Sequence, residues 1–292
     1  MIVIILKGGL GNQMFQYACG RALAIKNETK LILDTTFLND KFFKIFFSSR
    51  SYKLNIFNIE AHFSFFSRMS KLVPIPIFWT CLNYVSYYIK SIFKYGEYIS
   101  EKEENFLKKD LTLKKNIYLN GYWQNEEYFK NYTNFIQREF SFKRELFGLG
   151  RVILNRICSC ESVCVHVRRG DYITNKKALE THGFVGIKYY KDAIEIIKQK
   201  VKNPHFFIFS DDIEWCKNNI KTKEQKTYVS CGDNDLQLMT FCKHFVIANS
   251  SFSWWGAWLS KNTEKVVIVP KQWYVNSDLN NRHVVPKKWI EI

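Results

Sequence analysis

Acidic residues are scarce in this chain. Its 292 residues include 27 Asp and Glu against 43 Lys and Arg, which gives a formal net charge of +16. An excess of this size points to an anionic partner: a phosphorylated small molecule, a nucleic acid or an acidic membrane surface. Hydrophobic residues make up 47% of the chain and charged residues 24%, so the composition is that of a globular protein and does not favour disorder.

Cysteine pairs and a leader sequence are also lacking. None of the eight cysteines has the C-x-x-C spacing, and no signal peptide precedes the first apolar run. This pattern predicts a reduced protein of the cytoplasm. Cys158, Cys160 and Cys164 lie close together, but without a second ligand pair we interpret them as small buried residues and not as zinc ligands.

The longest uncharged run, between Lys71 and Lys90, is not a convincing transmembrane helix. Its 18 residues are enough for a span, but Pro74 and Pro76 break its beginning and several polar side chains would be penalised in hydrocarbon. A buried or lid-like segment, or a segment that contacts the membrane surface, is expected instead. Residues 41–95 carry eight Lys and Arg, one acid and 16 of the chain's 49 aromatics. Such a mixture suits anionic lipid headgroups, sugar rings or single-stranded nucleic acid.

The first half begins with a strand, a glycine loop and a helix. Residues 1–6 predict a buried parallel strand, a helical pattern starts at Asn12, and residues 31–33 predict the next strand. The loop between them lacks the third glycine of the dinucleotide fingerprint and the Gly-Lys-Ser/Thr of a P-loop. It predicts a tight turn whose backbone amides can approach a ligand. Further on, residues 117–122 predict a strand and residues 126–142 one helix.

The second half, from about residue 146, alternates between strands and helices. The apolar and helical patterns predict the strands 163–167, 205–209, one near Tyr228, 245–248 and 266–269, and the helices 188–201, a short one with Trp215, 234–243 and one ending at Leu259. This alternation predicts an α/β fold with a parallel, doubly wound sheet.

Polar side chains follow three of these strands where each strand ends. They are Arg168 and Arg169, Asp211 and Asp212, and the segment 249–253. Arginine forks suit a pyrophosphate, and serine hydroxyls with the amides of a helix start suit the same group. One of the two aspartates could accept hydrogen bonds from guanine; the alternative is that it caps the following helix. With arginines to stabilise the leaving diphosphate, we expect a site that needs no metal.

Four motifs together resemble the α-1,2-fucosyltransferases of glycosyltransferase family 11. They are GGLGNQMFQYA at 8–18, HVRRGDY at 166–172, SDD at 210–212 and NSSFSWWGAW at 249–258. The resemblance implies a GT-B fold, with two Rossmann-like doubly wound domains facing a cleft. It assigns residues 1–145 to the acceptor side, with an aromatic and basic insertion at about 40–115, and residues 146–292 to donor binding. It implies metal-independent transfer of fucose, with inversion, from GDP-fucose to the 2-hydroxyl of a terminal β-galactoside, without a cofactor.

The resemblance also assigns roles to residues. Arg168 would grip the β-phosphate, with Arg169 as support or internal brace. His166 and Asp171 would contact the nucleotide or organise the loop, and Asp171 is counted with Arg168 and Asn12 as catalytic. Asn12 would orient the acceptor or the glycosidic oxygen. The remaining donor-binding residues would be Asp211, Asp212, Asn249, Ser250, Ser251 and Phe252.

The general base and the wider setting stay open at this point. Asp34, Glu126 and Glu127 are unranked candidates for a base, unless the reaction is dissociative and needs only weak assistance. We expect a role in bacterial surface glycans such as O-antigen, in the cytoplasm, with peripheral contact to the inner face of its membrane as an option that stays open. The alternatives are transfer of another sugar, or a basic membrane- or nucleic-acid-binding protein. The nucleic-acid alternative leaves the three strand ends without a purpose, so we expect no nucleic-acid partner.

Overall fold

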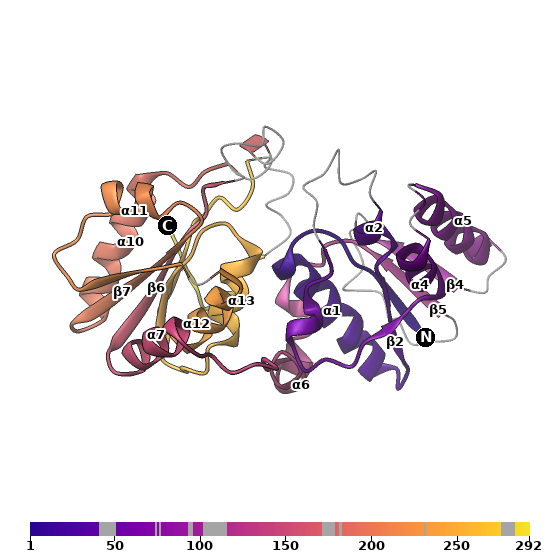
Figure 1. The fold of residues 1–292 in the computed structure, drawn as a ribbon, viewed down its shortest axis with the longest axis horizontal. Helices are drawn as coiled ribbons and strands as arrows, with labels where there is room; N and C mark the ends of the chain where they lie inside the picture. The colour runs from indigo at the N-terminus through magenta and orange to yellow at the C-terminus, as the bar shows by residue number, and fades with distance from the viewer. Residues whose placement is uncertain are drawn as a thin grey trace. The chain divides into compact units, whose positions relative to one another are not determined.

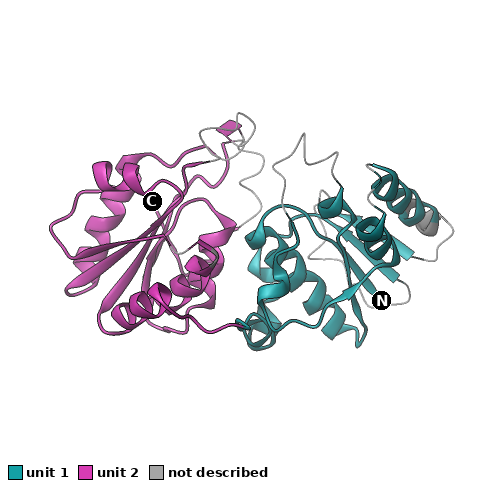
Figure 2. Cartoon of the chain, in the orientation of Figure 1, with its two compact units in different colours: residues 1–143 teal, residues 144–292 magenta. Residues whose placement is uncertain are grey.

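The computed structural model describes residues 1–40, 51–73, 75, 77–92, 96–101, 116–170, 179–180, 183–230, 232–275 and 284–292. The chain forms two compact units, Met1–Lys143 and Arg144–Ile292 (Figure 2). The sequence places the break at residue 146, slightly later. Each unit is an open parallel sheet covered by helices, which is the predicted α/β architecture.

The sheet of the first unit has the order β3-β2-β1-β5-β4 among the described residues, and each pair of neighbours is parallel. Its strands are β1 (Ile2–Ile5), β2 (Leu31–Asp34), β3 (His62–Phe63), β4 (Gly96–Ser100) and β5 (Asn116–Asn120). The first strand is central because its four residues are apolar and can be buried on both faces.

Helices cover both faces of this sheet (Figure 1). The long helix α1 (Leu10–Lys26) packs on the face of Ile4, and a Cβ at its Gly20 would lie 2.8 Å from a methyl group of Leu31. Glycine is therefore what lets this helix approach the sheet so closely. On the other face, Val3 and Ile5 pack against Tyr87 of α5.

The predicted insertion forms a small helical layer in its described part. After β2 come α2 (Thr36–Asn39), η1 (Leu54–Ile56) and β3, then α4 (Phe65–Leu72) and α5 (Phe78–Ile92) before β4. Ser64 caps α4, since its hydroxyl accepts a hydrogen bond from the Ser67 amide at 3.1 Å. Among the described residues, no helix is long and apolar enough to cross a membrane.

The second unit carries a parallel sheet of order β8-β7-β6-β9-β10-β11. Its strands are β6 (Glu161–Val167), β7 (Pro204–Ser210), β8 (Lys226–Val229), β9 (His244–Val246), β10 (Val267–Val269) and β11 (Ile290–Glu291). In chain order this is 3-2-1-4-5-6, the arrangement of a doubly wound nucleotide-binding fold. The last strand, β11, was not predicted because it has only two residues.

Two layers of helices enclose this sheet (Figure 1). One face, which includes Val163, Val165 and Val167, packs with α10 (Ile187–Lys200) and α11 (Ile213–Asn219). The helices α7 (Leu149–Cys158), α12 (Asp235–Phe241) and α13 (Ser251–Leu259) form the other layer.

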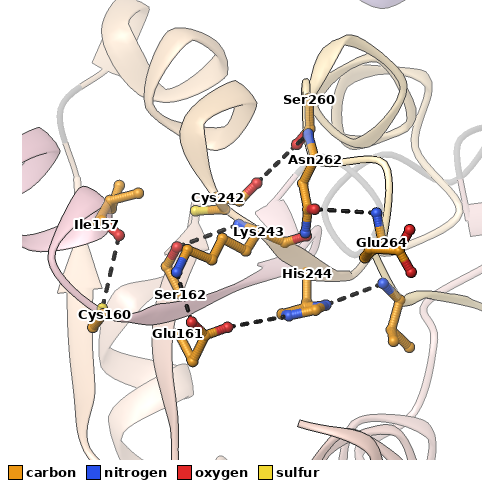
Figure 3. A network of polar contacts seen from close by, with 11 residues as sticks. Ile157, Cys160, Glu161, Ser162, Cys242, Lys243, His244, Ser260, Asn262 and Glu264 are labelled. Carbon is orange, nitrogen blue, oxygen red and sulfur yellow. Dashed lines mark hydrogen bonds and ion pairs between the residues drawn. The ribbon is translucent and has the colours of Figure 1, made fainter.

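A polar network holds the beginnings of β6 and β9 together (Figure 3). Lys243 donates to Glu161 at 2.6 Å, and the Lys243 amide donates to the Ser162 carbonyl at 3.0 Å. The ring of His244 accepts from the Val266 amide at its Nδ1, so its Nε2 carries the proton and faces Glu161. These contacts fix the relative position of the two strands whose opposite ends carry the predicted site.

Two predictions for the first unit are wrong: residues 96–100, expected to belong to an exposed helix or loop over 96–115, form the strand β4, and the helix predicted over 126–142 is interrupted. Instead of a single helix over 126–142 the chain forms η3 (Glu126–Tyr128), η4 (Lys130–Tyr132) and α6 (Thr133–Glu139). Phe129 interrupts the helix, because it is fully buried and its backbone takes φ −137° and ψ 4°. Tertiary burial of this ring overrides the helical pattern of its neighbours.

Candidate functional site

The order of the strands in the second unit identifies where a ligand is expected. From β6 the chain moves outward to β8 on one side and then returns to β9 on the other. The carboxyl ends of β6 and β9 therefore border the crevice that binds ligands in sheets of this kind. The predicted segments that follow these strands, Arg168 to Gly170 and Asn249 to Ser253, lie at this point, and Asp211 follows the neighbouring strand β7.

Arg168 is held by the aspartate that follows β7. Its Nη1 lies 2.8 Å from Oδ2 of Asp211, and the two side chains are 27% and 26% exposed. The other carboxylate oxygen of Asp211 accepts from the Arg169 amide at 2.9 Å. A Cβ at Gly170 would lie 2.9 Å from Oδ2 of Asp211, so a larger residue there would displace this carboxylate. The guanidinium is thus oriented and still partly open to solvent.

Arg169 is as exposed as its neighbour, at 28% against 27%, but its guanidinium has aromatic contacts as well as an ion pair. Its Nη1 pairs with Asp212, and its guanidinium lies over the rings of Trp215 and Phe184, with 5.2 and 5.9 Å between the Arg Cζ and the ring centroids. Cation–π contacts of this kind hold an arginine in one position. The surroundings suit the predicted role of a brace, which stays a prediction.

The two aspartates are both engaged within the protein. Asp212 caps α11, because its Oδ1 accepts from the Trp215 amide at 3.1 Å, and its Oδ2 pairs with Arg169. The capping alternative of the sequence is therefore found for Asp212. Asp211 bonds to Arg168 and to the Arg169 amide. Recognition of guanine by either carboxylate stays a prediction, and it requires that a nucleotide displaces one of these contacts.

His166 lies on β6, directly before the arginines, and is buried. Burial first, and the charge of Arg168 second, lower its pKa from 6.5 to about 3, so the ring is neutral at physiological pH. Its Nδ1 is buried and has no hydrogen-bond partner among the described residues. The ring of Phe252 lies 6.0 Å away, centroid to centroid. A neutral imidazole with an unused nitrogen can serve a nucleotide as a hydrogen-bond partner.

The segment after β9 presents the start of α13. Asn249 and Ser250 are buried, and the Asn249 amide group donates to the Trp273 carbonyl at 3.3 Å. The first turn of α13 contains no acidic residue. Since the first amides of a helix have no partner within the helix, this end offers donors and a positive dipole to an anion.

Tryptophans fix the position of α13. Trp254 donates from its indole nitrogen to the Val284 carbonyl at 2.9 Å and packs against Trp255 and Trp289. A Cβ at Gly256 would lie 2.9 Å from the Cβ of Met239, so α12 and α13 can pack this closely only with a glycine there. The amino end of α13 is consequently a rigid feature of the site.

In the first unit, Asn12 lies in the first turn of α1. Its Oδ1 accepts from Gln124, which follows β5, at 2.6 Å. Gln16, one turn further along α1, bonds to the amide and the carbonyl of Lys7 and to the Gly121 carbonyl. The side-chain amides of Gln124 and Gln16 thus join the ends of β1 and β5. From β1 the chain first adds strands on the β2 side of the sheet and then on the β5 side, so these two ends also mark a switch in strand order. Neither glutamine was singled out in the sequence, because its partner lies far away in the chain.

The candidate bases have different surroundings. Asp34 is fully buried, and both its oxygens accept hydrogen bonds from protein donors, so neither faces an acceptor sugar. Glu127 is exposed and pairs with Lys130 at 2.5 Å. Glu126 begins η3 and is half-buried. The predicted residue Asp171 lies outside the described residues.

The expectation of a metal-free site rests in part on the absence of any Asp-x-Asp triplet, and this premise is wrong, because the sequence contains Asp233-Asn234-Asp235. This triplet spans η5 (Gly232–Asn234) and the first residue of α12, after β8. Among the described residues, no three His, Cys, Asp or Glu side chains form a group that could hold a metal ion.

Taken together, the two units have the architecture of a GT-B fold, with two Rossmann-like domains. Among solved structures, the chain is similar to the NodZ α-1,6-fucosyltransferase soaked with GDP-fucose, with a TM-score of 0.50, 13% identity and coverage of 88% of this chain and 91% of that one. A variant of Arabidopsis thaliana FUT1 in complex with GDP gives a TM-score of 0.52 at 10% identity, covering 95% of this chain and 72% of that one. These likenesses confirm the predicted fold class.

The chain belongs to glycosyltransferase family 11, whose family model matches residues 1–292. It is 34% identical to an α-1,2-colitosyltransferase of Escherichia coli, over all of this chain and 99% of the relative. The O-antigen biosynthesis glycosyltransferase WbnK of the same species is 31% identical, with 98% and 99% covered. Human galactoside α-(1,2)-fucosyltransferase 1 is 28% identical over 49% of this chain and 42% of that protein. The protein is therefore a glycosyltransferase, as predicted.

Proposed function

We propose that the protein transfers fucose from GDP-fucose to the 2-hydroxyl of a terminal β-galactoside. In this reaction the acceptor oxygen bonds to the anomeric carbon of fucose from one face while the bond to the GDP oxygen breaks on the other. The configuration inverts, the GDP leaves as an anion and the acceptor loses its proton. The α-1,2 linkage is the one that the names of the colitosyltransferase and fucosyltransferase relatives state.

The observation that carries this proposal is the position of Arg168. It is a partly exposed guanidinium, held 2.8 Å from Asp211 at the carboxyl end of the central strand β6. The amino end of α13, which follows the neighbouring strand β9, has no acidic residue in its first turn. A leaving diphosphate needs stabilised negative charge, and a fixed cation with a helix dipole supplies it without reorganisation.

The donor-binding residues take distinct roles in this proposal. Arg168 binds the β-phosphate. Arg169, itself held by Asp212, keeps its neighbour in place through the bond of its amide to Asp211. Ser250 and Ser251 with the first amides of α13 bind the diphosphate. His166, Phe252 and Asn249 contact the nucleotide, and Asp211 or Asp212 accepts from guanine. For Asp171, which lies outside the described residues, we propose a contact with the nucleotide or a role in organising its own segment. Metal independence and the absence of a cofactor belong to the same proposal.

On the acceptor side, Asn12 orients the galactoside or the glycosidic oxygen. Its Oδ1 is held by Gln124 at 2.6 Å, which leaves its amide group as the donor. The two oxygens of Asp34 are occupied by protein donors, so we place the base, if one is used, at Glu126 or Glu127 or at a residue outside the described ranges.

The relatives also suggest where the reaction occurs. One of them is named for O-antigen biosynthesis, and we propose that this chain likewise builds a bacterial surface glycan. It would act in the cytoplasm, at the inner face of the membrane, on a galactoside-containing oligosaccharide or lipid-linked glycan. Nucleic acid is not among the proposed partners.

A second donor deserves the same assay, because the relative with 34% identity is a colitosyltransferase. Colitose is fucose without its 3-hydroxyl group, so one pocket can hold either sugar. A site that hydrogen-bonds the 3-hydroxyl would reject colitose strongly, since its buried partner would be left unpaired. A ratio of kcat/KM for the two donors therefore decides between the two functions.

The test is an assay of both GDP-sugars with a panel of β-galactoside acceptors, with the new linkage determined by NMR. We expect an α-1,2-linked fucosyl product and stabilisation of the protein by GDP but not by UDP or ADP in a thermal-shift measurement. Stabilisation by UDP alone would overturn the proposed donor. Preference for GDP-colitose would change the proposed donor sugar but not the proposed donor-binding site. Salt-sensitive oligonucleotide binding without GDP binding would favour a nucleic-acid-binding protein instead.

A further inference from the structure

The helix α5 carries its apolar residues on the outside. Phe78, Leu82, Val85 and Ile89 are spaced at intervals of four, three and four, which places them on one face of the helix. They are between 39% and 53% exposed. In a surface helix of a water-soluble protein this apolar stripe normally faces the core.

The opposite face of α5 is buried and polar. Asn83 and Tyr87 donate to the buried carboxylate of Asp34, the tyrosine at 2.8 Å. Thr80 donates to Asp40 at 2.8 Å, and Asp40 also accepts from the Ile77 amide at 2.9 Å. These bonds join the helix to the end of β2 and to α2, so its rotation about its own axis is fixed. The exposure of the apolar stripe is therefore built into the fold.

The neighbouring helix α4 repeats this inversion. Its buried residues are Ser67 and Ser70, which bond to Asp34 and to Asn39. Of its four large apolar residues, Phe65 and Leu72 are 67% and 74% exposed, whereas Phe66 and Met69 are half-buried. Two adjacent helices thus bury side chains that carry polar groups and present large apolar ones, which we call the outward face: Phe65, Leu72, Phe78, Leu82, Val85 and Ile89.

The charges around the outward face select among possible partners. Residues 64–92 contain Arg68, Lys71 and Lys90 but no Asp or Glu. Arg68 and Lys71 are exposed on α4, within the same helical layer. A second copy of this layer would bring bases against bases, which opposes self-association. An anionic lipid surface offers both negative headgroups for the bases and an acyl boundary for the apolar stripe.

We propose that the outward face of α4 and α5 rests on a membrane that contains anionic lipids. The helices lie in the plane of the interface, and Arg68 and Lys71 contact lipid headgroups. The Asp34 and Asp40 hydrogen bonds hold the apolar stripe toward the lipid. The proposed function includes a contact with the membrane, and the outward face is the surface that makes it. Only the nature of the acceptor glycan depends on the proposed function.

The experiment measures binding of the full chain to vesicles of phosphatidylcholine with and without phosphatidylglycerol. In the test variant Leu82→Ser, Val85→Ser and Ile89→Ser are combined. In the control, Leu149→Ser and Val152→Ser remove similarly exposed apolar residues from α7 in the other unit. We expect the test variant to lose at least about tenfold in affinity for the anionic vesicles, given the apolar area removed. The control should bind like the unchanged protein.

A charge variant, Arg68→Gln with Lys71→Gln, should weaken binding to anionic vesicles and reduce its salt dependence. Unchanged binding in the test variant, equal loss in the control, or equal binding to neutral vesicles would overturn the proposal. Light scattering without lipid adds one more outcome: a dimer that becomes a monomer in the test variant assigns the face to a second copy instead. GDP stabilisation and transfer to a soluble galactoside should be unaffected in every variant, so failure of the enzyme proposal is recognised separately.

Discussion

Adjacent arginines at the end of β6 have different partners, and this difference assigns them different expected effects. Arg168 pairs with Asp211 and is partly exposed, whereas Arg169 pairs with Asp212 and contacts two aromatic rings. A residue that acts on the leaving group should affect turnover and leave stability nearly intact. A residue that braces the loop should affect both.

The substitution Arg168→Ala is expected to lower kcat by about 10³-fold or more, the size of effect seen when a transition-state charge loses its partner. Asp211 keeps the Arg169 amide as a donor at 2.9 Å, so the free energy of unfolding should change by only about 1 kcal/mol. Arg168→Lys should recover a small part of the activity, because an ammonium cannot form the bidentate contact. Steady-state kinetics and urea unfolding measure the two effects.

The control for this substitution is Arg151→Ala, which removes an exposed arginine from α7 in the same unit. It should leave kcat and GDP stabilisation unchanged. An Arg168→Ala enzyme with near-normal kcat would show that the charge of the leaving diphosphate is stabilised elsewhere.

His166 should make the protein sensitive to acid. Its pKa is lowered to about 3 in the folded state by burial, while the unfolded chain takes up the proton near 6.5. Between these values the unfolded state binds more protons, so stability falls as pH is lowered from 6.5. At pH 5 the loss from this residue is about 2 kcal/mol. His205 and His244 also have lowered pKa values and add to the loss.

Urea unfolding of the unchanged protein and of His166→Gln at pH 7 and pH 5 isolates this contribution. The variant should lose about 2 kcal/mol less between the two pH values, since the other histidines are common to both proteins. An equal pH dependence in the two proteins would mean that His166 is protonated in the folded state.

At the scale of elements, Asp34 joins four parts of the first unit. One oxygen accepts from the Thr36 amide and hydroxyl and from Ser67, and the other from Asn83 and Tyr87, so β2, α2, α4 and α5 meet at one carboxylate. Burial, and then the Asp34 charge, raise the pKa of Tyr87, so its hydroxyl stays a donor. The helical layer that carries the outward face is held by this side chain together with Asp40.

Asp34→Ala is expected to lower the free energy of unfolding by about 3 kcal/mol, because several buried donors lose their acceptor. The exposed carboxylate Glu127 is a suitable control, and Glu127→Ala should cost less than about 1 kcal/mol. Urea unfolding followed by far-UV circular dichroism measures both. If the two substitutions cost the same, the buried donors have found other acceptors.

Apolar runs predicted strands well in this chain because a parallel strand buried on both faces must be continuously apolar. Thus residues 163–167 fall within β6 and residues 205–209 within β7. The bounds of a helix are harder to predict where one tertiary contact decides them, as at Phe129, whose burial interrupts the predicted helix. The sequence does not predict that α4 and α5 bury their polar faces, because the hydrogen-bond partners of these faces, Asp34 and Asp40, lie on distant segments.

For the molecule as a whole, the motifs located the strand ends that carry the candidate site, but they did not indicate which side chains of the protein contact the motif residues. The approach of Arg168 to Asp211 follows from the neighbouring positions of β6 and β7, which a parallel fold implies. The contacts of Arg169 with Phe184 and Trp215 and the joining of α1 to β5 by Gln16 depend on side-chain packing. Periodicity contains no signal for such contacts.

Metal dependence is a property of the whole reaction and provides the last prediction. If Arg168 and the start of α13 stabilise the leaving diphosphate, EDTA should not change kcat and added Mn²⁺ should not raise it. The triplet at 233–235 offers a direct comparison, because Asp235→Asn keeps the size of the side chain and removes the negative ligand. It should retain most of the activity. If EDTA abolishes transfer, Mn²⁺ restores it and Asp235→Asn is inactive, then a metal held by this triplet performs the task that we assign to Arg168.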